Sequence, residues 1–328
     1  MGRERNLKEK FFLAKKLIEK SKKILILSHK APDGDALSST LAMHYFLKRK
    51  NKESHPFLLN PPKYLSFLEG YDEIEKKAKK IRKINFDLIL LLDYAGKDRI
   101  ETPAKFEIDE KKCITFDHHP EDFHIGKVKI VEEKFASTTE LLYEFFLFLK
   151  EKITPPLATM LLCGIITDTA GGRRLSQESS KKVAELILKG ADFKKILEKY
   201  YSFSLEQGKL LGKLLSRIKT QKNIGVLYSY FLLDEIKKAK GFSLLEPPIF
   251  SDFLTQIEGY DIYLFLCEQK KGRVKVSLRS KKTDVSKIAK KFGGGGHKKA
   301  AGFRKKGSLK KVLKQVLKEI EKQKFQLQ

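Results

Sequence analysis

The chain has 328 residues, of which 41% are hydrophobic and 33% charged, and its formal net charge is +27. This length suits two domains better than one, and the apolar content is sufficient for buried cores, so an intrinsically disordered chain is excluded. No apolar run reaches the roughly 18 residues that a membrane-spanning helix needs. The charged residues 1–10 lack the apolar region of a secretory signal. Because Cys113, Cys163 and Cys267 are also far apart, we expect a cytoplasmic protein with reduced cysteines.

The positive charge is concentrated near the C-terminus. Residues 271–328 carry a net charge of +17, compared with +9 for residues 1–200 and +1 for residues 201–270. Such a block attracts polyanions, and nucleic acid is the expected partner, with a membrane surface as the alternative. Lysine accounts for 57 of the 68 basic residues, so a generally lysine-rich composition also explains part of the charge.

Short apolar runs alternate with helix-like segments in the first half of the chain. The apolar runs predict strands at residues 23–28, 86–93 and 113–117. Length and periodicity predict helices at residues 36–50, 137–150 and 155–166. Strands that are apolar throughout and separated by helices imply a parallel sheet covered on both faces. We therefore expect an α/β domain with a doubly wound, mainly parallel sheet.

A second and smaller α/β unit is predicted in the remainder of the chain. Helices at residues 176–199 and 205–220 are polar enough to form a connector. The following pattern predicts three strands and three helices, namely strands at 224–231, 262–267 and 274–279 and helices at 233–240, 285–292 and 309–320. Asp284 and Ser308 can cap the last two helices. The expected organisation is a first domain over residues 1–195, a helical linker over 196–221 and a second domain over 222–328.

Acidic residues and histidines follow the ends of the strand-like runs in the first domain. Carboxylates buried at strand ends require a cation or a proton, and four of them are expected to converge, namely Asp33, Asp35, Asp93 and Asp168. His29 and His118 add nitrogen ligands, and mixed oxygen and imidazole ligands suit Mn²⁺, Mg²⁺ or Fe²⁺. Six ligands are too many for one ion with an open position, and they suit two ions that share a bridging aspartate.

Each of these fragments is weak when taken alone. Asp-Gly-Asp is usually a turn, and a His-His pair is more often on the surface than on a metal. Four fragments that each follow a strand or end a helix in a doubly wound pattern favour the metal site over these alternatives.

The same residues resemble the motifs of a known family. The segments His29–Ser39, Leu92–Asp93, Asp117–Pro120 and Thr167–Thr169 resemble the four motifs of the DHH phosphoesterase superfamily. Val274–Ser280 and Ile288–Phe303 resemble its DHH-associated C-terminal domain, so the resemblance spans residues 22–305. Within the superfamily the chain is most similar to the small bifunctional oligoribonucleases that are also phosphatases of 3′-phosphoadenosine-5′-phosphate (PAP).

The resemblance implies roles for individual residues. One ion would be held by His29, Asp33 and Asp93, and the second by Asp35, Asp93, His118 and Asp168. The metal is usually Mn²⁺ in this family, with Mg²⁺ as the alternative. Asp117 would orient a histidine, and His119 would face the scissile phosphate, which makes these two residues the expected catalytic pair beside the metals.

A glycine run in the second domain is the other candidate site. Gly293–Gly296 precede His297, and the Arg279-Ser280 pair ends the strand before them. Alone, such a run is more often a flexible loop, but glycines also let backbone N–H groups approach an anion, and arginine suits phosphate. We expect these residues to bind substrate, namely Arg279, Ser280, Gly294, Gly295, Gly296 and His297.

The leading hypothesis is a metal-dependent phosphoesterase that acts on short oligoribonucleotides, from dimers to about pentamers, and on PAP. The alternatives are hydrolysis of cyclic di-AMP or pApA, a RecJ-like single-strand exonuclease, and a nucleic-acid-binding module with an inactive site. The segments after Asp35 and Asp168 depart from the family's pattern and border the expected substrate cleft. The expected partners are short RNA or nucleotides and no membrane, and the oligomeric state is left open, with a homodimer as one alternative.

Overall fold

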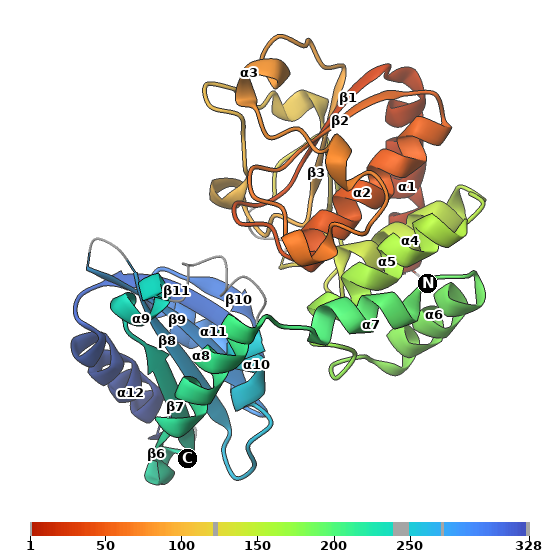
Figure 1. The fold of residues 1–328 in the computed structure, drawn as a ribbon. Coiled ribbons are helices and arrows are strands. Elements are labelled where there is room, and N and C mark those ends of the chain that lie inside the picture. The colour runs from red at the N-terminus through yellow and green to blue at the C-terminus, as the bar shows by residue number, and fades with distance from the viewer. Residues whose placement is uncertain (1, 121–123, 239–248, 270–271, 326–328) are drawn as a thin grey trace. The chain divides into compact units, whose positions relative to one another are not determined.

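The computed structural model describes residues 2–120, 124–238, 249–269 and 272–325. These residues form two compact units, Met1–Tyr200 and Tyr201–Gln328 (Figure 1). The predicted α/β class, with a parallel sheet, a helical segment and a second α/β unit, is confirmed. The domain limits predicted at residues 195 and 221 stay a prediction.

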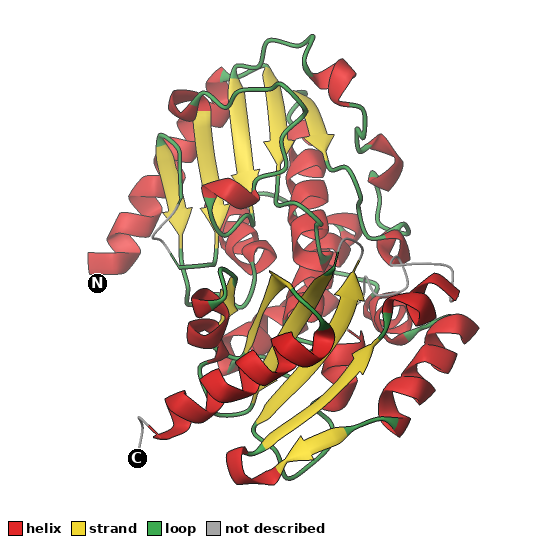
Figure 2. Cartoon of the chain, turned by 90° about the vertical axis from the view of Figure 1, so that its left-hand side faces the viewer, coloured by secondary structure: helices red, strands yellow, loops and turns green. Residues whose placement is uncertain are grey.

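In the described part of the first unit, five parallel strands are ordered β2-β1-β3-β4-β5 (Figure 2). They are β1 (Lys23–Leu27), β2 (Glu53–Phe57), β3 (Leu88–Leu92), β4 (Cys113–Asp117) and β5 (Val128–Val131). The chain leaves β1 for β2 on one side and then continues at β3 on the other, so the direction of winding reverses between β1 and β3. Ligands of open parallel sheets bind beyond the carboxyl ends of the strands at such a reversal.

Both faces of this sheet are buried. Leu90 and Leu92 belong to a large core that includes helices α1 (Gly2–Lys20), α2 (Gly34–Arg49), α4 (Thr138–Phe148), α5 (Pro155–Asp168), α6 (Gln177–Leu188) and α7 (Phe193–Tyr201). Leu91 points to the opposite face because side chains alternate along a strand. There it packs in a smaller core that includes Ile81 of the short helix α3 (Ala78–Ile81) and residues from loops. This double burial explains why β3 is apolar throughout.

Two glycines allow the helices beside the sheet to approach closely. A Cβ atom at Gly34 in α2 would lie 2.3 Å from Thr167 Oγ1 in α5. A Cβ atom at Gly164 in α5 would lie 2.3 Å from Thr139 Oγ1 in α4 and 2.5 Å from an oxygen of Asp35. Real Cβ atoms essentially never lie this close to another heavy atom. Helices α2, α4 and α5 can therefore approach one another around Asp35 only if residues 34 and 164 are glycine.

The second unit is built on a mixed sheet ordered β10-β11-β9-β8-β7-β6 among the residues described. Its strands are β6 (Lys219–Gln221), β7 (Val226–Phe231), β8 (Ile262–Gln269), β9 (Arg273–Ser280), β10 (Gly295–His297) and β11 (Ala300–Lys306). Helices α11 (Val285–Lys291) and α12 (Leu309–Phe325) pack on one face. On the other face, α8 (Leu205–Ser216) and α10 (Ile249–Leu254) pack over β7 and β8, and α9 (Leu233–Lys238) adds Ile236.

Most of the predicted elements are confirmed. The strand over Cys113–Asp117 agrees at both ends, and Asp284 caps α11 by accepting a hydrogen bond from the N–H of Ser286. The predicted helix at 176–199 is instead two helices, α6 and α7, because Gly190 has a φ of +89°. Residues 219–220 were wrongly predicted as helix, since Lys219–Gln221 pair with β7 as β6. Of the helix predicted at 233–240, residues 239–240 lie outside the described residues.

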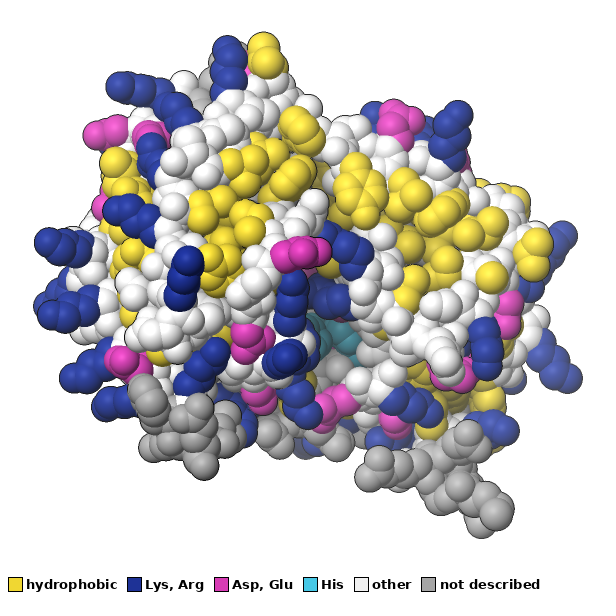
Figure 3. All heavy atoms as spheres, turned by 90° about the horizontal axis from the view of Figure 1, so that it is seen from below, with side chains coloured by type: hydrophobic (Ala, Val, Ile, Leu, Met, Phe, Trp, Pro, Cys, Tyr) yellow, Lys and Arg dark blue, Asp and Glu magenta, His cyan; other side chains and the backbone are white. Residues whose placement is uncertain are grey.

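The surface carries much of the positive charge, and Figure 3 shows lysine and arginine side chains spread widely over the face in view. The three cysteines are free and buried, as predicted. In the described ranges, no helix combines the length and the apolar composition that crossing a membrane requires.

We expect Gly164→Ala to lower the free energy of unfolding of the first unit by about 1–3 kcal/mol, because the new methyl group overpacks the contact with Thr139. The matched control is Gly212→Ala in α8, where a Cβ atom would meet no atom within 4 Å. That change should stabilise an exposed helix by about 0.5–1 kcal/mol. Urea unfolding followed by circular dichroism measures both, and an unchanged Gly164→Ala protein would show that the close approach is not a constraint.

Candidate metal centre

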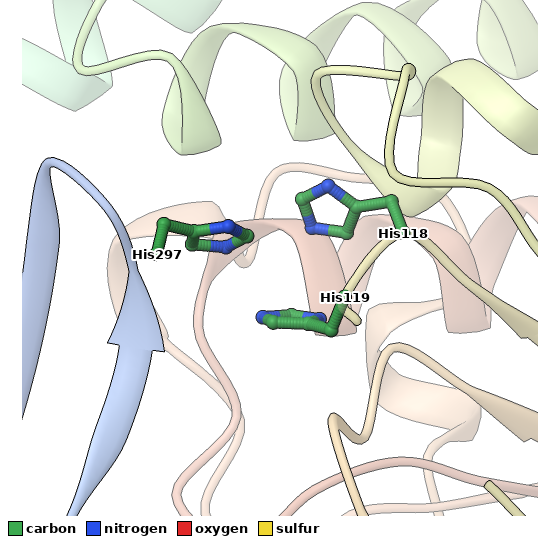
Figure 4. A group of neighbouring side chains, drawn as sticks. All are labelled: His118, His119 and His297. Carbon is green, nitrogen blue, oxygen red and sulfur yellow. The ribbon is translucent and has the colours of Figure 1, made fainter. Parts of the chain in front are cut away.

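The candidate residues of the first unit gather where the direction of winding reverses. Asp93 directly follows β3, and Asp117 is the last residue of β4. His118 and His119 come next in the chain, and Figure 4 shows their side chains side by side, with ring centroids 4.6 Å apart. His297, which is also labelled there, belongs to β10 of the second unit. The carboxyl ends of neighbouring parallel strands therefore bring the motif residues together, as the sequence predicts.

One group of possible ligand atoms comprises His29, Asp33 and Asp93, and these atoms lie within 4.8 Å of one another. His29 Nε2 is 3.7 Å from Asp33 Oδ2 and 3.9 Å from Asp93 Oδ2. The other ring nitrogen, Nδ1, lies 2.9 Å from the carbonyl oxygen of Lys30, which can only accept a hydrogen bond. Nδ1 therefore carries a proton, which leaves Nε2 as the ring atom that faces the two carboxylates and that would bind a metal.

A second group comprises Asp35, Asp93 and His118. His118 Nε2 is 3.6 Å from Asp93 Oδ1 and 3.4 Å from Asp168 Oδ2, so Asp168 at the end of α5 borders this group. His118 Nδ1 donates to the carbonyl oxygen of Phe135 at 3.2 Å. Both histidines thus present Nε2 to carboxylates and use Nδ1 to fix the ring.

Asp93 belongs to both groups and occupies an unusual position. Its side chain is only 2% exposed, and its backbone adopts a φ of +51°, a left-handed conformation that few residues other than glycine adopt. The backbone is held by a hydrogen bond from Asp93 N–H to the carbonyl oxygen of Phe116 in β4. This strained backbone conformation occurs at the carboxylate that lies between His29 and His118.

Asp35 is held by the N-terminus of α4. Its carboxylate accepts hydrogen bonds from the N–H groups of Thr138 (2.6 Å) and Thr139 (3.1 Å) and from the Thr139 hydroxyl (2.8 Å). Thr138 Oγ1 also donates to Asp93 Oδ1 at 3.1 Å. Our sequence analysis missed both threonines. The signal was present, because Ser137 and Glu140 have the spacing of a helix N-terminus, and such a terminus favours anions.

Asp117 is completely buried, and it forms a further group of possible ligand atoms with Asp93 and His119. One oxygen accepts hydrogen bonds from the N–H groups of Tyr94 and Ala95, both at 2.8 Å, and so joins the ends of β3 and β4. The other accepts from the backbone N–H (3.0 Å) and from Nδ1 (2.8 Å) of His119. His124, which the sequence analysis also missed, has Nε2 3.0 Å from Asp117. This geometry matches the orienting role that the resemblance implies for Asp117.

Burial and mutual repulsion make Asp35, Asp93 and Asp168 hard to ionise, whereas at Asp33 the neighbouring His29 outweighs burial and lowers the pKa. Burial, with repulsion from Asp168 and Asp33, raises the pKa of Asp35 to about 7, and burial also raises the pKa of Asp93 well above its usual range. Burial acts in the same direction on Asp117, but His119 and His124 outweigh it and hold the pKa of Asp117 well below the usual range. Carboxylates and imidazoles that face one another in this way fit divalent cations, which would supply the missing positive charge.

The substrate-binding residues predicted in the second unit lie on β9 and β10, which are separated in the sheet by β11, except for Gly294, which directly precedes β10. Arg279 Nε donates to Asp252 Oδ1 at 3.0 Å, a partner that the sequence analysis missed, and the Ser280 hydroxyl donates to the carbonyl oxygen of Thr283. Gly295–His297 form β10 rather than a loop. A Cβ atom at Gly294 or Gly296 would lie within 2.5 Å of a backbone oxygen of β11. Close packing against β11 therefore explains why both positions are glycine. The substrate-binding role of these residues, Gly295 included, stays a prediction.

Comparison with known proteins agrees with the motifs. Residues 23–165 match the N-terminal domain of the DHH family, and residues 223–323 match the DHHA1 domain. The chain therefore belongs to the DHH family and is a phosphoesterase whose His and Asp clusters fit a divalent-metal site.

The names of individual relatives describe more specific activities than the family match does. The bifunctional oligoribonuclease and PAP phosphatase NrnA of Thermus thermophilus is 29% identical, over 87% of this chain and 84% of its own. An exopolyphosphatase-related protein from Bacteroides fragilis has a similar structure, with a TM-score of 0.83, 27% identity and coverage of 96% of both chains. RecJ from Thermus thermophilus, solved in complex with Mn²⁺, has a TM-score of 0.52 at 13% identity, over 96% of this chain and 54% of its own.

We expect Asp93→Asn to lower the metal content from two ions per chain to one or none, because Asp93 is common to both groups of ligands. Activity should fall by more than about 100-fold, since even partners that only orient ligands cost 10–100-fold. Asparagine tolerates a positive φ, so circular dichroism should show an intact fold. Elemental analysis after dialysis measures the metal, and two retained ions would refute the shared role.

A second pair of variants separates the adjacent histidines. His118→Ala should lower both metal content and turnover, whereas His119→Ala should lower turnover by about 10²–10³-fold and leave the metal content unchanged. The reason is that His119 is held by Asp117, whereas His118 presents Nε2 to Asp93 and Asp168. His55→Ala is the matched control, because His55 contacts Glu53 and Phe86 instead. Equal metal loss in the first two variants would contradict this division of roles.

Proposed function

We propose that the protein hydrolyses oligoribonucleotides of two to about five residues to mononucleotides and converts PAP to AMP. This proposal rests mainly on Asp93, which belongs to two groups of His and Asp side chains that could bind metal. The similarity of the chain to NrnA, which extends over 87% of its length, supports the choice of substrates. Both reactions break a phosphorus–oxygen ester bond, so one site serves both substrates.

The proposed ligands divide between two divalent cations. His29, Asp33 and Asp93 would hold one ion, and Asp35, Asp93, His118 and Asp168 would hold the other. We propose Mn²⁺, with Mg²⁺ as the alternative, and the RecJ structure with Mn²⁺ supports this choice. When bound, such cations lower the pKa of a coordinated water and neutralise charge on the phosphoryl oxygens.

The chain's own residues contribute orientation and proton transfer. Asp117 accepts a hydrogen bond from Nδ1 of His119 and so fixes the ring, which leaves Nε2 as the atom that can take a proton from the attacking water or return one to the leaving oxygen. Burial lowers the pKa of His119, so the ring is mainly neutral at pH 7 and serves first as a proton acceptor. Thr138 and Thr139 hold Asp35 and Asp93 in place without a net charge of their own.

A comparison of substrates tests the proposal. We would measure hydrolysis of pApA, a pentanucleotide, PAP, cyclic di-AMP and a long single strand side by side, each with Mn²⁺. Inorganic polyphosphate belongs in the comparison because of the protein from Bacteroides fragilis. The proposal expects pApA, the pentanucleotide and PAP to have the highest kcat/KM values.

Each alternative has its own outcome. A preference for cyclic di-AMP or for the long strand would replace the proposal with a cyclic dinucleotide phosphodiesterase or a RecJ-like exonuclease. Activity on polyphosphate alone would indicate an exopolyphosphatase. No hydrolysis of any substrate, or of bis(p-nitrophenyl) phosphate, would indicate a binding module.

The role proposed for Arg279 leads to a further prediction. Arg279→Lys keeps the positive charge and loses the planar fork that binds phosphate at two points, so we expect KM for pApA to rise about tenfold or more. Hydrolysis of bis(p-nitrophenyl) phosphate should change less than twofold, because this small substrate has no second phosphate. Asp252→Asn is the control, since it weakens the ion pair of Arg279 but retains the arginine. Equal losses on both substrates would mean that Arg279 supports the structure and does not bind the nucleotide.

A further inference from the structure

Four cations form an unusual arrangement on the sheet of the second unit. In the antiparallel register of β9 and β11, Lys275 lies opposite Arg304, and Arg273 lies opposite Lys306. We call these four residues the basic strip. All four are exposed, and their neighbours Val274 and Val276 are buried against α11 and α12, so the strip lies on the opposite face of the sheet, which it shares with Arg279.

The basic strip costs the protein stability. Like charges directly opposite each other on neighbouring strands are destabilising, and here two such pairs follow one another on one face. Within the described residues, none of the four cations forms an ion pair with an acidic side chain. Elsewhere in the described part of this unit, some cations are paired with carboxylates, as Arg217 is with Glu235 and Lys291 is with Glu319. A bound polyanion would offset the repulsion.

The strip continues from the residue proposed to bind the substrate. Arg279 lies four positions after Lys275 along β9, which corresponds to about 14 Å at 3.4 Å per residue. Between them the same face carries Ser277, which is paired with Gly302 of β11. Because both residues are small, no long side chain of this pair stands between Arg279 and the strip. The distribution of arginine also supports phosphate binding on this face of the sheet. Arg273, Arg279 and Arg304 are three of only 11 arginines in the chain.

We propose that the basic strip binds the phosphates of a single-stranded oligonucleotide whose one end is held at Arg279. This inference rests on the proposed function and extends it, because it names what accommodates nucleotides beyond the second. Arginine contributes two-point hydrogen bonds to phosphate and lysine a mobile point charge. A dinucleotide ends before the strip, whereas a pentanucleotide reaches it. The strip therefore determines the preference for the longer substrates among oligonucleotides of two to about five residues.

The test compares two double variants of the full-length protein that lose the same charge. Lys275→Gln with Arg304→Gln removes the first pair of the strip, and Lys310→Gln with Lys314→Gln removes two exposed lysines from α12. KM is measured with Mn²⁺ for pApA and for the pentanucleotide. Binding of both is also measured by calorimetry in EDTA, as a readout that does not depend on activity. Thermal unfolding checks that the variants are folded.

We expect the strip variant to bind the pentanucleotide at least about tenfold more weakly, with KM raised to match, and pApA less than twofold more weakly. The dependence of log Kd on log salt for the pentanucleotide should fall by about 1.4, because each phosphate contact of a single strand contributes about 0.7. The α12 variant should behave like the wild type. If the wild type hydrolyses no oligonucleotide but this length-dependent binding is found, the strip is supported and the proposed function fails.

Three results would overturn the proposal that the basic strip binds an oligonucleotide. Equal weakening of pApA and the pentanucleotide would show that length plays no part. Equal effects of the strip and α12 variants would show that only net charge matters. An equal loss of affinity for inorganic polyphosphate of similar length would show a general polyanion surface, not an oligonucleotide site.

Discussion

Repulsion between buried carboxylates is the constraint on which the first unit depends. Asp35, Asp93 and Asp117 are almost inaccessible to solvent, and Asp33 and Asp168 lie beside them. Bringing negative charges out of water and close together is among the least favourable arrangements a fold can contain. The sheet reversal, the helix ends and the histidine tautomers can all be understood as ways in which the chain makes this arrangement possible.

The carboxylates are stabilised by different means. Asp35 is placed at the positive end of α4, where two backbone N–H groups are directed at it. Asp117 receives four hydrogen bonds and two imidazole neighbours, and it remains ionised. Asp93 has only the hydroxyl of Thr138 as a hydrogen-bond donor to its side chain among the contacts described. The fold therefore satisfies the supporting carboxylate and leaves the shared one in need of positive charge, which is what separates a structural acid from a metal ligand.

The strand ends and the motif residues could be predicted from the sequence because both depend on local pattern. An apolar run followed by Asp or His is visible without a structure, and parallel strands bring their carboxyl ends together by topology. The threonines of α4 could not be predicted as partners of Asp35, because that contact joins residues 103 positions apart. The pairing of Arg279 with Asp252 and the contact between Gly164 and Thr139 depend in the same way on tertiary packing. Strands β2 and β5 were missed because Glu53–Phe57 contains a proline and polar residues and Val128–Val131 is only four residues long.

The wide separation of the contacting residues also determines when the site can form during synthesis. Asp35 leaves the ribosome long before Thr138 and Thr139, and Asp168 follows later still. Until α4 has emerged, the nascent chain carries Asp35 without the helix end that holds its carboxylate. The second group of ligands therefore cannot form on the early chain, and it should be complete only once about the first 170 residues are free, so that loading of this group with metal follows folding.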